Sequence, residues 1–194
     1  MDNYIGPIER FMKKYKGNLF HILLEEYIGF FTRHLPSIEG IVIRRILYRS
    51  LFKKMGRDAL IYPGVYITHT YGIEVGDKLS VNSGAVLDGR GGIRIGNSVM
   101  VGPHAVLVSS THQHKQIEVP MAILDHIMQP LVIQDDVWIG ANAFIKGGIN
   151  IGRGVVIAAG SSVLTDIEEY KIVGGVPGCI IGDRRDKKAD YAGL

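Results

Sequence analysis

The sequence predicts an all-β fold, a parallel β-helix that follows a helical N-terminal segment. Aliphatic residues recur every six positions over about 100 residues. The first 57 residues lack this repeat and carry helical patterns instead. A long break in the repeat after Leu107 predicts a loop that leaves the β-helix.

The six-residue repeat defines the architecture. A helix repeats every 3.6 residues and a strand every two, so a persistent period of six fits neither. It is typical of a hexapeptide β-helix, in which each unit is one short strand and a corner. Three units make a triangular coil, and successive coils lie about 4.8 Å apart. The repeating residues, which we expect inside the prism, are Ile61, Ile67, Val75, Val81, Leu87, Ile95, Val101, Leu107, Ile133, Ile139, Ile145, Ile151, Ile157 and Val163.

Particular residues mark the corners. Glycine directly follows the repeating residue in five units, and we interpret it as a corner residue with positive φ. These glycines are Gly76, Gly96, Gly102, Gly140 and Gly152. Asn82 and Asp88 take the same place in two other units, and both residue types tolerate left-handed backbone.

Three breaks in the repeat are informative. Ile67 and Val75 are eight residues apart, as are Leu87 and Ile95, while Leu107 and Ile133 are twenty-six apart. These breaks recur at the third corner of successive coils, so we expect the insertions to stack along one edge of the prism. The long insertion, about residues 111–130, begins within "STHQHKQ". Loops on a rigid scaffold commonly carry function.

Residues 1–57 are predicted to be helical and basic. We expect helices in "PIERFMKKYKG", in "NLFHILLEEYIGFFTRH" and at about residues 38–55, the last capped by Ser37. The segment holds eleven Lys/Arg against five Asp/Glu, and residues 41–57 hold six basic residues and no acidic one. The third helix could cover the open first coil. It could also lie on an anionic membrane, and the two roles are compatible.

Bulk properties predict a cytoplasmic protein, with a peripheral position at the inner membrane face if the basic helix binds lipid. The chain is 46% hydrophobic and 21% charged. Its single cysteine, Cys179, fits a reducing compartment. The start resembles no signal peptide, and Glu25 and Glu26 interrupt the longest apolar stretch, so we expect no membrane-spanning helix. No nucleic-acid partner is expected.

The loop motif "THQH", followed by "DDVWIGANAFI", "GVVIAAGSSVLTDI" and "VGGVPG", resembles the left-handed β-helix O-acetyltransferases. These hexapeptide-repeat enzymes include galactoside and maltose acetyltransferases, and the similarity covers about residues 60–182. The N-terminal "RRILYRSLF" is more similar to acetyltransferases of bacterial capsule, exopolysaccharide and O-antigen synthesis. The chain is thus divided into a helical segment (1–57), a β-helix acetyltransferase domain (58–182) and a C-terminal tail (183–194).

The resemblance implies a homotrimer of parallel prisms, with acetyl-CoA as donor in the groove between subunits and no metal. It implies O-acetylation of a sugar hydroxyl, in bacterial surface polysaccharide synthesis. Transfer from a thioester to a hydroxyl needs a base, and neutral histidine suits this role. The family's catalytic histidine matches His112. His114 is the alternative base in the same loop and a candidate acceptor contact.

Three residues are expected to face the acceptor or the groove. Asn82 matches a family position that contacts the acceptor sugar. We expect Asn82 and Asp88 to lie one coil below His112, near its edge, with Asp88 as a second acceptor contact. Trp138, the only tryptophan, should point outward by alternation, and the family has tryptophan here beside the groove. It could instead serve only in trimer packing.

Four residues are expected along the cofactor. Ala141 and Ala159 match positions where a small residue lets the pantetheine arm approach the backbone, and Thr165 matches the region near the adenine. The family often has a basic residue shortly after its Gly-x-Pro motif, where this chain has Cys179. Arg184 is therefore the candidate for the CoA 3′-phosphate.

Other functions share parts of this pattern. An N-acetyltransferase of amino sugars would have the same fold and donor, and a xenobiotic acetyltransferase has related chemistry. A β-helix carbonic anhydrase would need three histidines on zinc. His69, His104 and His126 add to the loop histidines, but the paired coil histidines of such a site are missing. A non-catalytic β-helix scaffold would not need His112, Trp138 and the long loop together.

Overall fold

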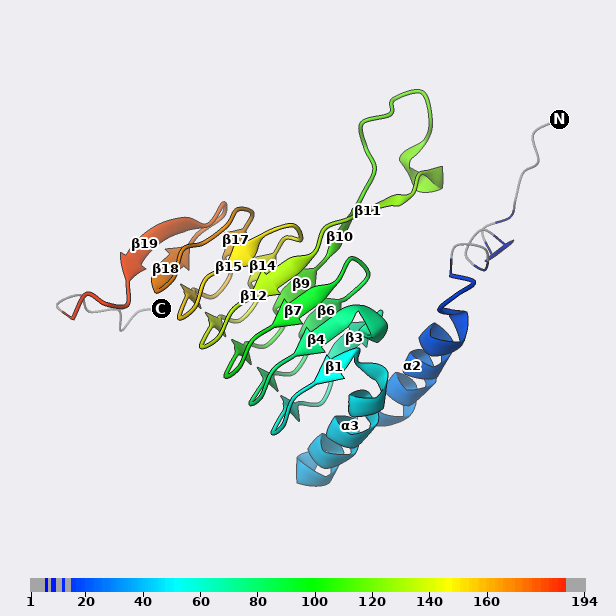
Figure 1. The fold of residues 1–194 in the computed structure, drawn as a ribbon, viewed down its shortest axis with the longest axis horizontal. Helices are drawn as coiled ribbons and strands as arrows, with labels where there is room; N and C mark the ends of the chain where they lie inside the picture. The colour runs from blue at the N-terminus through cyan, green and yellow to red at the C-terminus, as the bar shows by residue number, and fades with distance from the viewer. Residues whose placement is uncertain (1–5, 7, 10–11, 13–14, 188–194) are drawn as a thin grey trace.

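The computed structural model describes residues 6, 8–9, 12 and 15–187, with two helices at one end of a prism of short strands (Figure 1). Helix α2 spans Leu19–Thr32 and helix α3 spans Ser37–Leu51. The helix expected in residues 7–17 lies partly outside the described residues, and residues 15–17 form a turn. In the part of the chain that is described, no helix is long and apolar enough to cross a membrane.

The prism has three sheets, named A, B and C in the order in which the chain enters them, and each coil adds one parallel strand to each. Sheet A contains β1 (Lys54–Met55), β4 (Ile73–Val75), β7 (Ile93–Ile95), β12 (Leu131–Ile133) and β15 (Asn150–Ile151). Sheet B contains β2 (Leu60–Ile61), β5 (Ser80–Val81), β8 (Met100–Val101), β13 (Trp138–Ile139), β16 (Val156–Ile157), β18 (Lys171–Gly174) and the antiparallel β19 (Cys179–Asp183). Sheet C contains β3 (Tyr66–Thr68), β6 (Val86–Asp88), β9 (Val106–Val108), β14 (Phe144–Ile145) and β17 (Ser162–Val163).

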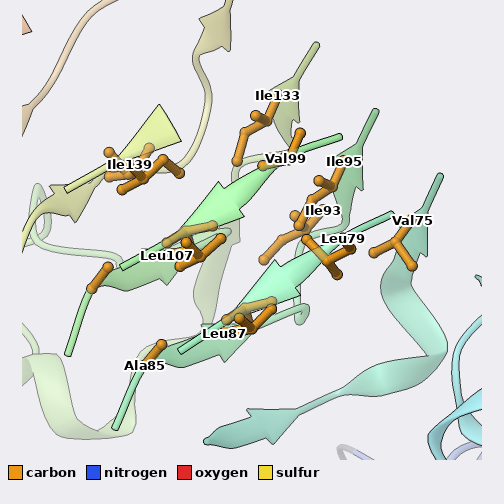
Figure 2. Close-up of a cluster of buried hydrophobic side chains, with 14 of the residues drawn as sticks. Val75, Leu79, Ala85, Leu87, Ile93, Ile95, Val99, Leu107, Ile133 and Ile139 are labelled. Atoms are coloured by element: carbon orange, nitrogen blue, oxygen red, sulfur yellow. The ribbon is translucent and has the colours of Figure 1, made fainter. Parts of the chain in front are cut away.

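The repeating aliphatic residues form the core. All fourteen predicted positions are buried. Leu87 pairs in register with Leu107, and Ile95 with Ile133, so each stacks on its equivalent one coil away (Figure 2). Such columns bury nearly every inward side chain, which supplies the main driving force for folding. The predicted repeat is confirmed.

The expected role of the corner glycines is wrong. Positive φ occurs three residues after the repeating residue, as at Lys78, Ser98 and His104, and the five glycines that directly follow it lack positive φ. Their small size is needed for another reason. A Cβ on Gly140 would lie 2.5 Å from the backbone nitrogen of Ala159 in the next coil. Glycine at this position therefore lets neighbouring coils stack closely.

The insertions stack at the corner between sheets C and A, as predicted from the breaks in the repeat. The first contains a short 3₁₀ turn, η1 (Thr70–Gly72), and the longest forms a projecting hairpin (Figure 1). In this hairpin β10 (Ser110–His112) pairs antiparallel with β11 (His126–Met128), and η2 (Met121–Ile123) lies between them. The long loop therefore has its own paired base beside the prism.

The helices cover the open end of the prism, as expected for a cap. Tyr48, Leu51 and Phe52 are buried in the same cluster as the first coil. Arg44 is also buried, and its guanidinium donates to the carbonyl oxygens of Ile61, Thr32 and Leu35, each at 2.8 Å. Its burial was not predicted.

Two details of this region differ from the predicted third helix. Helix α3 ends at Leu51, four residues before the predicted end, because Lys54–Met55 pairs with β4 as the first strand of sheet A. Ser37 makes no capping hydrogen bond to the backbone. Its hydroxyl contacts the Glu39 carboxylate, and its φ is positive.

Candidate active site

A groove of about 290 Å³ runs along the outer face of sheet B. It brings together four of the predicted site residues: Asn82, Trp138, Ala141 and Ala159. The full lining is Ser80, Asn82, Met100, Gly102, Pro103, Trp138, Gly140, Ala141, Val156, Ile157, Ala158 and Ala159. Most of this lining is small or apolar, so an extended ligand could lie close to the backbone of successive coils.

Trp138 forms the aromatic wall of the groove. It points outward from β13, as predicted, and remains 40% exposed. Its strand neighbours in register are Met100 and Val156, which also line the groove. An exposed indole between apolar neighbours is a contact surface for a ligand or for another subunit.

His112 lies at the base of the projecting hairpin, at the corner between sheets C and A. It is the last residue of β10 and is exposed, and it pairs across the hairpin with His126. The two imidazole rings are 4.2 Å apart at their centroids. His114 also belongs to this loop, and its Nδ1 lies 3.1 Å from the carbonyl oxygen of His112.

Arg90 supports the pair of histidines from below. Its Nη1 lies 3.3 Å and 3.2 Å from the two ring nitrogens of His126, so the guanidinium lies against the imidazole face. The Nε of Arg90 is buried and has no hydrogen-bond partner. Neither residue was predicted as part of an acetyltransferase site. Arg90 lies in the short insertion one coil below His112, a signal that could have identified it, whereas the fold of the hairpin was needed to place His126.

Asp88 and His69 join this corner to the helical cap. Asp88 Oδ1 lies 2.8 Å from His69 Nδ1 and accepts a hydrogen bond from the backbone N–H of Arg90 at 3.0 Å. Burial alone would raise the pKa of Asp88. The hydrogen bonds from His69 and Arg90 outweigh that effect and hold the pKa below its usual value.

Asn82 and Asp88 do not lie at one edge, which corrects their expected placement. Asp88 ends β6 at the corner between sheets C and A, one coil below the corner from which His112 departs. Asn82 follows β5 at the corner between sheets B and C, where its Nδ2 donates to the carbonyl oxygen of Val101 at 3.2 Å. Within one chain, sheet C separates Asn82 and its groove from His112.

Thr165 and Arg184 do not line the groove. Thr165 is exposed after β17. Arg184 follows β19, and its Nη1 donates to the Gly154 carbonyl at 2.7 Å and to the Asp136 carboxylate at 3.0 Å. An anionic ligand would therefore share this guanidinium with the Asp136 carboxylate.

The outer faces of the three sheets differ in chemistry. Sheet A presents charged residues such as Lys54, Glu74 and Arg94. Sheets B and C instead present large apolar residues, including Met100 at 50% exposure and Phe144 at 37%. Exposed apolar side chains on two adjacent faces indicate a protein contact surface there.

No group of three or more His, Cys, Asp or Glu side chains arranged to hold a metal ion occurs among the described residues. His112 and His126 therefore belong to no such group in the described part of the chain. The zinc carbonic anhydrase alternative therefore receives no support from the geometry of the site.

Comparison with known proteins identifies the family. The family model described as bacterial transferase hexapeptide (six repeats) matches residues 130–165. A putative acetyltransferase of Saccharomyces cerevisiae is 32% identical over 173 residues, covering 89% of this chain and 87% of the yeast protein. The chain belongs to the hexapeptide-repeat acetyltransferases. The putative colanic acid biosynthesis acetyltransferase WcaF of Escherichia coli is 28% identical to this acetyltransferase over 141 residues, 73% of this chain and 75% of WcaF.

Solved structures agree with this assignment. A hexapeptide-repeat acetyltransferase of Vibrio cholerae, complexed with acetyl coenzyme A, has 30% identity and a TM-score of 0.77, covering 86% of this chain and 88% of that chain. A galactoside acetyltransferase in complex with coenzyme A has 26% identity and a TM-score of 0.82, covering 91% of this chain and 87% of that chain. This chain is thus an acyltransferase, and it has the left-handed parallel β-helix fold.

Proposed function

We propose that this enzyme transfers an acetyl group from acetyl-CoA to a sugar hydroxyl, with His112 as general base. The observation that carries the proposal is the apolar groove on sheet B together with an exposed histidine at the foot of the projecting hairpin. The structures that contain acetyl coenzyme A or coenzyme A support the choice of donor. In this proposal Trp138, Ala141 and Ala159 contact the pantetheine arm.

A homotrimer would bring together the groove on sheet B and the hairpin base that carries His112. Packing sheet B of one subunit against sheet C of the next would bury the apolar outer residues of both sheets. The corner between sheets C and A would then lie beside the neighbour's sheet B. His112 of one subunit would meet the groove and Asn82 of the other, although sheet C separates them within one chain.

The chemistry requires only one proton shuttle. The acceptor hydroxyl gives its proton to the neutral imidazole of His112 as its oxygen attacks the thioester carbonyl carbon. The tetrahedral intermediate expels CoA as a thiolate, which takes the proton back from the imidazolium. Backbone N–H groups are the natural donors to the oxyanion. The products are an acetyl ester and the CoA thiol.

The acceptor is proposed to be a bacterial surface glycan or its precursor. The likeness to WcaF, whose name refers to colanic acid biosynthesis, supports this class. We assign Asn82, His114 and Asp88 to the acceptor side. Because Asp88 is already bound to His69 and to the backbone of Arg90, we expect it to act mainly by shaping the corner. Thr165 and Arg184 remain our candidates for the adenine end.

We also propose contact with an anionic membrane through residues 41–57. Only three of the six basic residues in this segment are available for that contact. Arg44 is buried, while Lys53 and Arg57 pair with Glu74 and Asp77. Arg45, Arg49 and Lys54 are left to meet lipid.

The test is an acceptor screen with purified enzyme and acetyl-CoA, with thiol release as the readout. With a competent acceptor, His112→Ala should lose roughly 10²–10⁴ of the rate, the usual share of general-base catalysis. His114→Ala is the matched control and should be much milder. If both variants keep near-normal turnover, the assignment of the base is wrong. If an amino sugar gives a stable amide faster than any hydroxyl acceptor gives an ester, the N-acetyltransferase alternative replaces this proposal.

A further inference from the structure

Helix α2 buries the polar residues Glu25 and Thr32 and exposes most of its large apolar residues, whereas a soluble surface helix usually buries its apolar side. Its buried residues are Ile22, Glu25, Gly29 and Thr32. Its large exposed residues form the apolar stripe of α2: Phe20, Leu23, Leu24, Tyr27, Phe30 and Phe31. At 100° per residue these six lie within an arc of about 120° on the helix surface.

The reversal is stabilised by hydrogen bonds on the inner side. Glu25 is 2% exposed, and its carboxylate accepts hydrogen bonds from the backbone N–H groups of His69 and Thr70, each at 2.8 Å. The orientation of α2 is therefore fixed by the first coil. The outer face is left with Phe20 at 79% and Phe30 at 74% exposure, a patch large enough to mark an interaction site.

Helix α3 packs against α2 and also exposes apolar residues together with positive charge. Ile38, Val42 and Ile46 are exposed at i, i+4 spacing, so they form a second apolar row. Arg45 and Arg49 lie on the same outward side of the helix by its 3.6-residue period. No acidic side chain in the described part of the chain forms an ion pair with either arginine.

We infer that the apolar stripe of α2, with Arg45 and Arg49 beside it, docks on an anionic lipid surface. Amphipathic helices bind membranes in this way, with apolar side chains below the headgroups and cations among them. A second copy of the chain fits less well. In a two-fold contact the same face meets itself, so one cationic face would oppose another.

The position of the helices supports lipid over a neighbouring subunit. They lie across the end of the prism, opposite β18 and β19 (Figure 1). The apolar outer residues of sheets B and C lie on the sides instead. In the parallel trimer of the proposed function, on which this step rests, three α2 stripes share one end. Three weak contacts on one membrane would reinforce each other.

The test is flotation of the full chain with lipid vesicles, without donor or acceptor, so its outcome is separate from the acetyltransferase assay. Vesicles of phosphatidylcholine alone are compared with vesicles containing about one-third phosphatidylglycerol, at about 0.05 M and about 0.5 M salt. We expect capture by the anionic vesicles, strongest at low salt. Phe30→Gln/Phe31→Gln should weaken capture about ten-fold or more. If that variant does not fold, Leu23→Gln/Tyr27→Gln is used in its place.

Matched control variants distinguish binding through this face from nonspecific adsorption to the vesicles. Arg45→Gln/Arg49→Gln should weaken binding about 25-fold at low salt, or about five-fold per charge, with no effect at high salt. Arg94→Gln/Arg153→Gln removes two charges from the prism and should change little.

Three results would overturn the inference. One is no capture of the wild type by anionic vesicles at low salt. Another is equal capture by both vesicle types. The third is a sedimentation mass of two trimers that falls to one in Phe30→Gln/Phe31→Gln, because a second copy would then be the occupant.

Discussion

Replacing Glu25 by Gln tests how the helical cap is attached to the edge that carries His112. The Glu25 carboxylate accepts hydrogen bonds from the backbone N–H groups of His69 and Thr70, at 2.8 Å each, and from the Thr70 hydroxyl at 2.6 Å. His69 in turn contacts Asp88, which holds the backbone of Arg90 beneath the histidine pair. The change keeps the shape of Glu25 but removes one acceptor oxygen and the charge.

The structure gives the size of the effect. The amide can turn its oxygen toward only one of the two backbone donors, so the other loses its acceptor, at about 1–3 kcal/mol. The remaining hydrogen bonds lose their charge assistance, about 1 kcal/mol more. Easier desolvation of the neutral amide offsets part of this cost. The two costs sum to about 2–4 kcal/mol, and after this offset the net destabilisation is about 1–3 kcal/mol, or about 5-fold to 140-fold in the local opening equilibrium.

Amide hydrogen exchange by mass spectrometry measures this opening. Peptides covering α2 and residues 66–72 should exchange faster in Glu25→Gln, while β13 and β16 stay protected because distant coils of a solenoid do not contact the cap. Glu26→Gln is the control, since its exposed carboxylate accepts one hydrogen bond from the Tyr66 hydroxyl. Equal exchange in the two variants would show that Glu25 does not anchor the cap.

Three further outcomes follow from the structure. Gly140→Ala should lower Tm by at least about 5 °C in thermal scans, since its Cβ would meet the backbone of Ala159 at 2.5 Å. An unchanged Tm would show that neighbouring coils can accommodate a methyl group at this position. Trp138→Ala should weaken coenzyme A binding about ten-fold in calorimetry with little change in Tm, because the indole is 40% exposed; unaltered affinity would place the cofactor elsewhere. The pKa of Asp88 is lower folded than unfolded, so its stabilising contribution is present at neutral pH and disappears as pH falls through the folded pKa. The stability advantage of the wild type over Asp88→Asn should therefore shrink on acidification, and a constant difference in urea unfolding from pH 6 to about pH 3 would contradict this.

The fold could be predicted from the sequence because one structural rule acts on every coil. A residue that points into the prism must be aliphatic, and it recurs with each strand, so the period of six records which side chains face inward. The same count located the inserted corner, since an insertion delays the next inward residue by its own length. His112 could be placed at that corner for this reason, and Trp138 on an outer face by alternation.

The six-residue period carries no information about the contacts made by segments outside the repeat, such as the hairpin and the two helices. The contact of His126 with His112 depends on how residues 110–128 fold back as a hairpin. The burial of Arg44 depends on carbonyl groups from two segments, Ile61 in β2 and Thr32 and Leu35 at and after the end of α2. The sequence of α2 is apolar on most sides, so only its hydrogen bonds to the first coil decide which face is exposed. The sequence thus determined the inward pattern, which is local and periodic, and the tertiary structure decided the contacts between segments that do not repeat.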